Sequence, residues 1–250
     1  MSNVVCPYIN SQKMLALQYE DILKGDKDLI KKVTPDFAVG CKRVLFTDNF
    51  LPTLVNKKSK VHLITEEISG ISKNGIVIKE EETYELDLIV YATGFSNENS
   101  LFGFETIGRN DTYLKDYFEE NPFAYLGISV PNFPNFFFVL GPNTILAHSS
   151  LVFMAECEAN YIMDVLAQTM SSEIDSVEVR KGVARDFATE MQELTSKMNF
   201  SGGCRSWYRR KKDGKNVILW PSSLYHYWWI TRKANILRDY KITTRSDESR

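Results

Sequence analysis

Two adjacent cations, Lys42 and Arg43, begin the segment KRVLFT and are well suited to chemistry on a charged ligand. An ammonium or guanidinium suits a dianionic phosphate, and a fixed guanidinium donates several hydrogen bonds to a developing oxyanion. On residue type alone, the pair is more simply read as the charged start of a strand. The choice between these readings depends on what surrounds the pair.

Two glycine-bearing turns follow strongly apolar segments, LDLIVY at 86–91 and NFFFVL at 135–140. Such segments are typical of strands buried on both faces, as in a parallel sheet. Ligands of open α/β sheets lie at the carboxyl ends of strands, often at a helix N-terminus. The pattern indicates nucleotide binding, although the glycines could serve only to make turns with positive φ. The turns consist of Ala92, Thr93, Gly94 and of Gly141, Pro142, Asn143, Thr144.

Periodicity and turn chemistry predict the elements that would position these residues. Residues 11–33 have a helical apolar pattern that Gly25 interrupts and Thr34-Pro35 ends. Short β segments are predicted between residues 61 and 91, with a hairpin at Asn74-Gly75. Further helices are predicted at 150–170 and 183–198; further strands are predicted at 42–47, 135–140 and 177–180, with strand-like stretches at 217–220 and 225–230.

The composition excludes several classes of protein. With 250 residues, 12% aromatics and a net charge of −2, the chain is globular rather than disordered. It has no apolar run long enough for a membrane span and no signal peptide, and its four cysteines are widely separated. We therefore expect a cytoplasmic protein in a reducing compartment, without a disulfide framework. The three histidines are isolated, so no metal site is expected.

The charge is uneven along the chain. Residues 205–250 hold twelve Lys/Arg and four Asp/Glu, a net +8, whereas the remainder carries −10. Such a tail could hold phosphates, bind RNA or simply form a solvated surface. No helix-turn-helix, RNP or zinc pattern is present, so no nucleic-acid partner is expected.

Five segments, in order, resemble flavin-dependent monooxygenases of the Baeyer–Villiger type, a group of the class B flavoprotein monooxygenases. The similarity runs from about residue 21 to residue 240. It implies an α/β fold made of parts of two Rossmann-like dinucleotide-binding domains. Residues 1–90 would finish an NADPH-binding domain with a β-meander, and residues 91–250 would form the returning part of an FAD-binding domain with an aromatic tail. The segments are TPDFAVGCKRVLFTDNFLPTL (34–54), LDLIVYATGF (86–95), YLGISVPNFPNFFFVLGPNT (125–144), GCRSWY (203–208) and WPSS (220–223).

The resemblance implies two cofactors, FAD and NADPH, and an organic substrate with O2. In the family, NADPH reduces FAD, and a flavin C4a-peroxide then oxidises a ketone, sulfide or amine. Lys42 would meet the 2′-phosphate of NADP, and Arg43, the catalytic candidate, would reach the flavin and steady the nicotinamide. Trp207 would contact NADP, although a core aromatic is an ordinary alternative.

The two turns also gain roles from the resemblance. Residues 92–94 would line the crossover between the domains, or form a plain turn. Residues 141–144 would lie beside the flavin ring with the next helix presenting its N–H groups, while Asn143 and Thr144 could alternatively be simple helix caps. Trp220, Trp228 and Trp229 are read as packing residues or substrate-tunnel walls.

The family's two G-x-G-x-x-G fingerprints and its F-x-G-x-x-x-H signature are absent, since no G-x-G occurs in the sequence. The chain therefore resembles the C-terminal half of such an enzyme, and would need the missing N-terminal half in cis or in trans. A non-catalytic remnant is the alternative. The sequence does not choose between ketone, sulfide and amine substrates.

Overall fold

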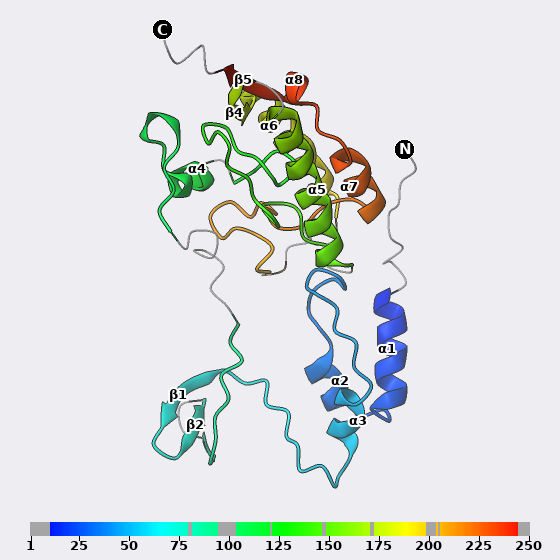
Figure 1. The fold of residues 1–250 in the computed structure, drawn as a ribbon. Helices are drawn as coiled ribbons and strands as arrows, with labels where there is room; N and C mark the ends of the chain where they lie inside the picture. The colour runs from blue at the N-terminus through cyan, green and yellow to red at the C-terminus, as the bar shows by residue number, and fades with distance from the viewer. Residues whose placement is uncertain are drawn as a thin grey trace. The chain divides into compact units, whose positions relative to one another are not determined.

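The computed structural model describes residues 11–79, 82–94, 104–120, 122–146, 149–170, 173–198, 204 and 206–244. The chain divides into two compact units (Figure 1). Unit 1 comprises Met1–Val39 and Val44–Ser96, and unit 2 comprises Gly40–Arg43 and Asn97–Arg250. The short segment Gly40–Arg43 thus belongs with the C-terminal part of the chain. The expected domain division after residue 90 stays a prediction.

Unit 1 begins with the predicted broken helix. Lys24 and Gly25 both have positive φ, so the chain turns between the two helices, and the Asp26 carboxylate caps the second by accepting from the Leu29 N–H. The helices of this unit are α1 (Ser11–Ile22), α2 (Lys27–Val33) and α3 (Phe50–Val55).

The predicted meander is present as a three-stranded antiparallel sheet in the order β1-β2-β3. Its strands are β1 (Ile68–Ser72), β2 (Gly75–Ile78) and β3 (Glu82–Glu85). Ser72 pairs with Gly75, so the hairpin turns through Lys73 and Asn74. A Cβ on Gly75 would overlap the Tyr84 carbonyl oxygen, which explains why only glycine fits there.

Three predicted strands of this part of the chain are wrong. Residues 42–47, 61–64 and 86–91 form no strand, and Leu88 and Val90 are each 77% exposed. A strand buried on both faces needs neighbours on both sides, and no described segment pairs with 86–91. The apolar composition of residues 86–91 shows that they are suited to burial. Their burial would need neighbouring strands, and the described residues of this unit contain none beside them.

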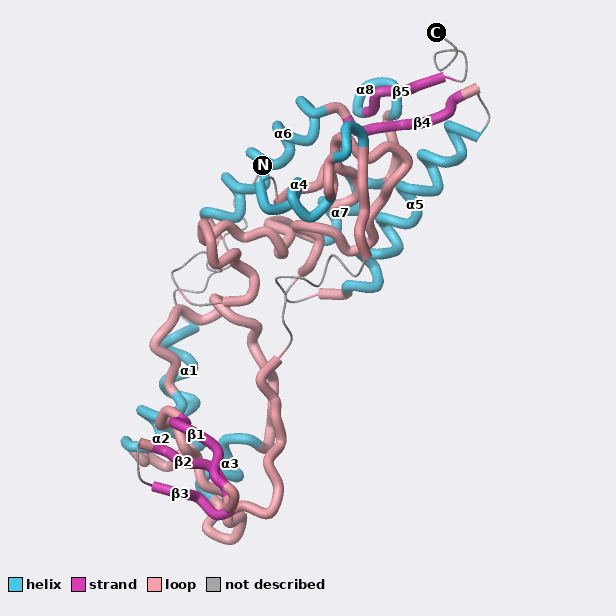
Figure 2. Tube along the Cα trace, turned by 90° about the vertical axis from the view of Figure 1, so that its left-hand side faces the viewer, coloured by secondary structure: helices cyan, strands magenta, loops and turns pink. Residues whose placement is uncertain are grey.

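Unit 2 packs long helices against a small antiparallel ribbon of β4 (Ile174–Val179) and β5 (Tyr240–Thr244). The predicted helices are confirmed as α5 (Leu151–Met170) and α6 (Lys181–Ser196), and α5 lies beside α7 (Leu224–Thr231) (Figure 1). Figure 2 shows that much of the chain between α4 and α5 is loop. The remaining elements are the 3-10 turn η2 (Arg109–Asp111), α4 (Leu114–Glu120) and α8 (Ile236–Asp239).

Two predictions for unit 2 are corrected. Residues 135–140 form no strand: Phe137 makes an isolated bridge with Ser129, and the Asn135 N–H donates to the Val177 carbonyl oxygen of β4. Residues 225–230 are helical, because Ser223 accepts a hydrogen bond from the His226 N–H at 3.1 Å and starts α7. The cap overrides the β-preference of this aromatic run. No helix in the described ranges is long and apolar enough to cross a bilayer.

Candidate functional site

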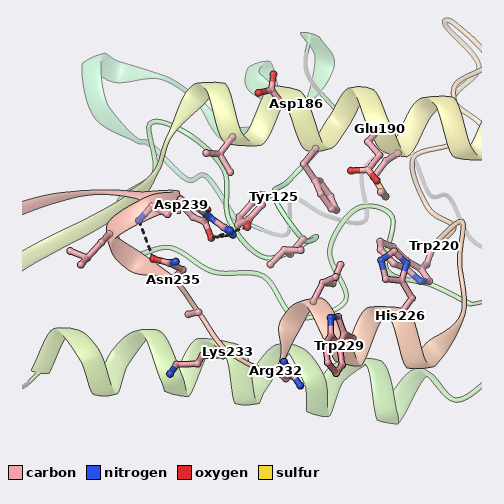
Figure 3. A pocket seen from close by; sticks show the side chains of 18 of the residues that line it. Tyr125, Asp186, Glu190, Trp220, His226, Trp229, Arg232, Lys233, Asn235 and Asp239 are labelled. Atoms are coloured by element: carbon pink, nitrogen blue, oxygen red, sulfur yellow. Dashed lines mark hydrogen bonds and ion pairs between the residues drawn. The ribbon is translucent and has the colours of Figure 1, made fainter. Parts of the chain in front are cut away.

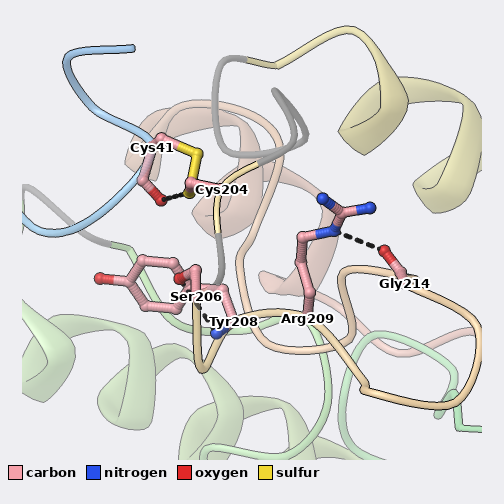
Figure 4. The surroundings of a disulfide bond; sticks show 6 residues. All are labelled: Cys41, Cys204, Ser206, Tyr208, Arg209 and Gly214. Carbon is pink, nitrogen blue, oxygen red and sulfur yellow. Dashed lines mark hydrogen bonds between the residues drawn. A yellow bond between two sulfur atoms is a disulfide. The ribbon is translucent and has the colours of Figure 1, made fainter. Parts of the chain in front are cut away.

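A disulfide joins two of the sequence segments that carry the resemblance. Cys41 of GCKR bonds to Cys204 of GCRSWY across 163 residues, with a Cα–Cα distance of 6.2 Å (Figure 4). This corrects the expectation that the cysteines form no disulfide. Two isolated cysteines so far apart carry no sequence signal for pairing, and only the fold brings them together. Cys157 remains a free, buried thiol.

The bond brings the predicted cationic pair to the predicted tryptophan. Lys42 and Arg43 are exposed, and the half-exposed Trp207 ring lies 4.6 Å from the Tyr208 ring. Burial raises the pKa of the Tyr208 phenol, and the nearby Arg43 guanidinium partly counteracts this. The segment with Lys42 and Arg43 and the segment with Trp207 are therefore joined within unit 2, and we call these three residues the cation–indole site.

The segment that follows Cys204 links this site to the GPNT turn. Figure 4 shows the Arg209 Nε donating to the Gly214 carbonyl oxygen at 2.7 Å, and Arg209 also forms a β-bridge with Asn216. The Asn143 amide then donates to the Asn216 and Leu219 carbonyl oxygens at 3.1 and 3.0 Å. The segment 209–219 is thus bound to the turn.

The GPNT turn is buried and held by its own side chains. Thr144 Oγ1 donates to the Gly141 carbonyl oxygen at 2.7 Å, and the Asn143 amide is used by the contacts above. A Cβ on Gly141 would overlap the Gly127 carbonyl oxygen. All four residues are buried, Pro142 included. The Asn143 N–H also donates to the Val217 carbonyl oxygen at 3.0 Å, so side chains and backbone of the turn both serve its shape.

The alternative reading of Asn143 and Thr144 as helix caps is wrong. Helix α5 begins at Leu151, and Ser150 Oγ accepts from the Phe153 N–H at 3.2 Å. The helix that follows the turn therefore starts several residues after Thr144, and its first N–H groups belong to a different stretch of chain.

Sequence reasoning missed a buried carboxyl that supports the turn. Glu158 of α5 has no exposed surface; its Oε2 accepts from the Leu140 N–H at 2.5 Å, and its Oε1 accepts from the Tyr227 hydroxyl at 2.9 Å. Burial raises the pKa of Glu158, and the hydrogen bonds from Leu140, Tyr227 and Thr144 oppose the rise. The signal was available, since Glu158 shares the apolar face of α5 with Met154 and Tyr161.

The third predicted group, Ala92, Thr93 and Gly94, lies in unit 1 and is exposed. Gly94 has φ +86°, and a Cβ added to it would find nothing within 4 Å, so its conformation alone requires glycine. The cofactor role of these three residues stays a prediction.

Unit 2 also contains a cavity of about 1080 Å³ between α6 and the segment from α7 to α8 (Figure 3). Asp186 and Glu190 line one wall, and Arg232 stacks on Trp229 at the other, with 3.5 Å from its guanidinium carbon to the ring centroid. Trp220 also lines the cavity; it is buried and packs on Tyr227. Among the described residues, no group of His, Cys, Asp or Glu is arranged to hold a metal ion.

Comparison with curated proteins identifies relatives of one kind. The chain is 36% identical over 220 residues to a Baeyer–Villiger monooxygenase of Pseudomonas aeruginosa, covering 88% of this chain and 41% of the relative. It is 30% identical over 219 residues to a Baeyer–Villiger monooxygenase of Streptomyces coelicolor (87% and 41%). It is 32% identical over 210 residues to an FAD-binding monooxygenase of Aspergillus niger (82% and 34%). No protein-family model matches the chain.

Solved structures share the fold. An oxidised steroid monooxygenase bound to NADP matches with a TM-score of 0.83 at 23% identity, over 95% of this chain and 45% of that one. A cyclohexanone monooxygenase from Rhodococcus sp. Phi1 bound to NADP+ matches with a TM-score of 0.82 at 22% identity (96% and 46%). The mixed α/β fold is therefore that of part of these enzymes.

Fold and sequence together define a flavoprotein-monooxygenase type of chain. It belongs to the Baeyer–Villiger and FAD-binding monooxygenase family. It spans about two fifths of the length of the curated relatives it matches.

Proposed function

We propose that the chain supplies the cation–indole site and the flavin-facing turn of an NADPH- and FAD-dependent monooxygenase. The whole enzyme would transfer one oxygen atom of O2 to a small ketone, sulfide or amine. The observation that supports the proposal is the disulfide between two separate segments, of which one bears Lys42 and Arg43 and the other bears Trp207. In the proposed enzyme, these segments complete parts of two Rossmann-like domains.

The donor set of this site fits the phosphorylated end of NADP. The exposed Lys42 ammonium would pair with the 2′-phosphate, and the exposed face of Trp207 offers a flat surface for a ring or ribose. The Arg43 guanidinium would donate hydrogen bonds where negative charge develops on the flavin, and would hold the nicotinamide in place. When bound, FAD supplies the redox chemistry with O2.

The GPNT turn would contribute to the flavin site rather than to the NADP site. The turn would form part of the wall beside the flavin ring, and Glu158 would stabilise that wall by accepting from the Leu140 N–H. Residues 92–94 would line the passage between the domains, where Gly94 lets the backbone come close to a cofactor. Both roles rest on the resemblance and on the open surroundings of Gly94.

A non-catalytic remnant is the second candidate. The sequence contains no G-x-G, and the exposed segment 86–91 finds no partner strand in the described residues. Such a chain would keep the packed core of unit 2 and bind no flavin.

Complementation distinguishes the two candidates. The chain is co-expressed with a second chain that carries both G-x-G-x-x-G fingerprints, and the purified complex is assayed for bound FAD, NADPH oxidation and oxygenated product. The proposed enzyme becomes yellow and consumes NADPH with product formation. A colourless complex that forms no product in excess FAD supports the remnant.

Arg43→Ala tests the assigned role within that complex. The variant should lose product formation more than flavin reduction, because the guanidinium acts after NADPH has delivered its hydride. Arg185→Ala is the matched control, since Arg185 is an exposed arginine of α6 away from this site. Equal product yield from the Arg43→Ala and Arg185→Ala complexes rejects the role.

A further inference from the structure

The Cys41–Cys204 disulfide joins two segments that each bear a proposed nucleotide contact. Cys41 directly precedes Lys42 and Arg43, and Cys204 stands three residues before Trp207. Figure 4 shows the bond beside Tyr208, whose ring contacts Trp207. The bond is therefore placed where it can set the spacing between the cations and the indole.

The cationic segment enters unit 2 as a stretch of four residues. Gly40–Arg43 belong to this unit, and the chain on both sides of them belongs to unit 1. Gly40 and Cys41 are buried, whereas Lys42 and Arg43 are exposed. The backbone is thus fixed at Cys41, and the two cationic side chains extend from that fixed point.

We propose that the Cys41–Cys204 pair is a redox-sensitive positioning bond for nucleotide binding. When closed, it holds Lys42 and Arg43 next to Trp207, in the arrangement that receives a nucleotide with a 2′-phosphate. When open, the segment 40–43 is released from Cys204 and the arrangement is populated only part of the time. The inference rests on the proposed function for its ligand, and on the disulfide for its mechanism.

A low-molecular-weight disulfide such as oxidised glutathione can close the Cys41–Cys204 bond by thiol–disulfide exchange. The two cysteine thiols lose two protons and two electrons as their S–S bond forms, and the S–S bond of the small molecule breaks to give two thiols. A dithiol reductant reverses the step by forming its own disulfide. Cys204, which is partly exposed, is the sulfur that an external thiolate can reach, and the buried Cys41 then leaves.

The size of the effect follows from the fraction of binding-competent molecules. If opening the bond lowers that fraction to about one tenth, the apparent affinity for the nucleotide falls about tenfold. The loss arises without removal of any nucleotide contact.

Two measurements on the full 250-residue chain test the inference. The first is the affinity for 2′,5′-ADP, measured by titration calorimetry after equilibration with oxidised glutathione or with dithiothreitol. The second is the rate of tryptic cleavage after Lys42 and Arg43, followed by mass spectrometry, with cleavage after Lys57 as the internal reference. Peptide mapping without reductant establishes the state of the bond in each sample.

The oxidised chain should bind 2′,5′-ADP about tenfold more tightly and be cut about tenfold more slowly after Lys42 and Arg43. Cys41→Ser and Cys204→Ser should behave as the reduced chain in either buffer. Cys157→Ser is the matched control and should keep the full redox response, because Cys157 takes no part in the bond. The wild-type comparison stands even if a serine variant does not fold.

The two measurements test the redox-sensitive bond and the proposed phosphate contact separately. Equal cleavage rates in the two redox states overturn the positioning bond, and so does measurable binding of 2′,5′-ADP with the same affinity in both states. Failure of both states to bind 2′,5′-ADP overturns the proposed phosphate contact, and redox-dependent cleavage in the same samples still supports the tether.

Discussion

Glu158 of α5 and Tyr227 of α7 share a hydrogen bond of 2.9 Å in the interior of unit 2. The Tyr227 hydroxyl also lies 2.7 Å from the Leu126 carbonyl oxygen, so one phenolic proton faces two acceptors. A proton on Glu158 resolves this, because the carboxyl can then donate to Tyr227 while Tyr227 donates to Leu126. Burial raises the pKa of Glu158, which shifts the balance toward this neutral form.

Glu158→Gln should therefore be nearly neutral for stability, and Glu158→Ala should not. The glutamine amide can accept from the Leu140 N–H and donate to Tyr227, as the protonated carboxyl does. Alanine leaves the Leu140 N–H without its acceptor and opens a cavity beside Tyr227, which costs about 2–4 kcal/mol in free energy of unfolding. Urea unfolding followed by tryptophan fluorescence measures both free energies of unfolding. A glutamine variant as unstable as the alanine variant would contradict the neutral network.

The same carboxyl predicts a pH dependence with a defined sign. Its pKa in the folded state is raised above the usual 4.5, so its contribution is fully present below pH 4.5. That contribution is lost as pH rises through the folded-state pKa, at about 1.4 kcal/mol for each unit of difference. Unfolding curves of wild type and Glu158→Gln between about pH 4 and pH 8 should diverge, with only the wild type losing stability on this account. Parallel curves would show that Glu158 titrates normally.

Gly141→Ala should destabilise unit 2 by about 2 kcal/mol or more, because the new Cβ would overlap the Gly127 carbonyl oxygen, a backbone atom in a close-packed region. Gly182→Ala is the matched control. Gly182 lies in α6 with nothing within 4 Å of its Cβ position, so alanine should stabilise by up to about 1 kcal/mol. Thermal unfolding of both variants measures the difference, and equal midpoints would refute the close contact.

The elements that local patterns specify are the ones that sequence predicts well. The break at Gly25, the apolar face of α6 and the hairpin each depend on neighbouring residues alone. The sequence predicts the hairpin at Asn74-Gly75, and the structure turns one residue earlier, at Lys73-Asn74. Residues 86–91 and 135–140 depend instead on which strands come to lie beside them. A run of apolar residues cannot report that, and both were wrongly predicted as strands.

In the candidate site, too, the features that depend on contacts between distant residues could not be predicted from local patterns. The family resemblance points to Lys42, Arg43 and Trp207, and the structure joins their two segments by a bond that no spacing rule indicates. Glu158 was missed because a carboxyl is expected at a helix surface, whereas its partners Leu140 and Tyr227 come from distant parts of the chain. Contacts between residues far apart in the sequence depend on how the chain packs. Local sequence patterns do not show them, whereas similarity to a known family can indicate them.

Lys42→Ala should remove the preference of the complemented enzyme for NADPH over NADH. A charged hydrogen bond to a phosphate contributes about 1.5–3 kcal/mol, so kcat/KM for NADPH should fall roughly ten- to a hundredfold. The value for NADH should change little, because NADH has no 2′-phosphate. Lys181→Ala, which removes an exposed lysine at the start of α6, should leave both values unchanged. Equal losses with the two nucleotides would mean that Lys42 shapes the site rather than contacting the phosphate.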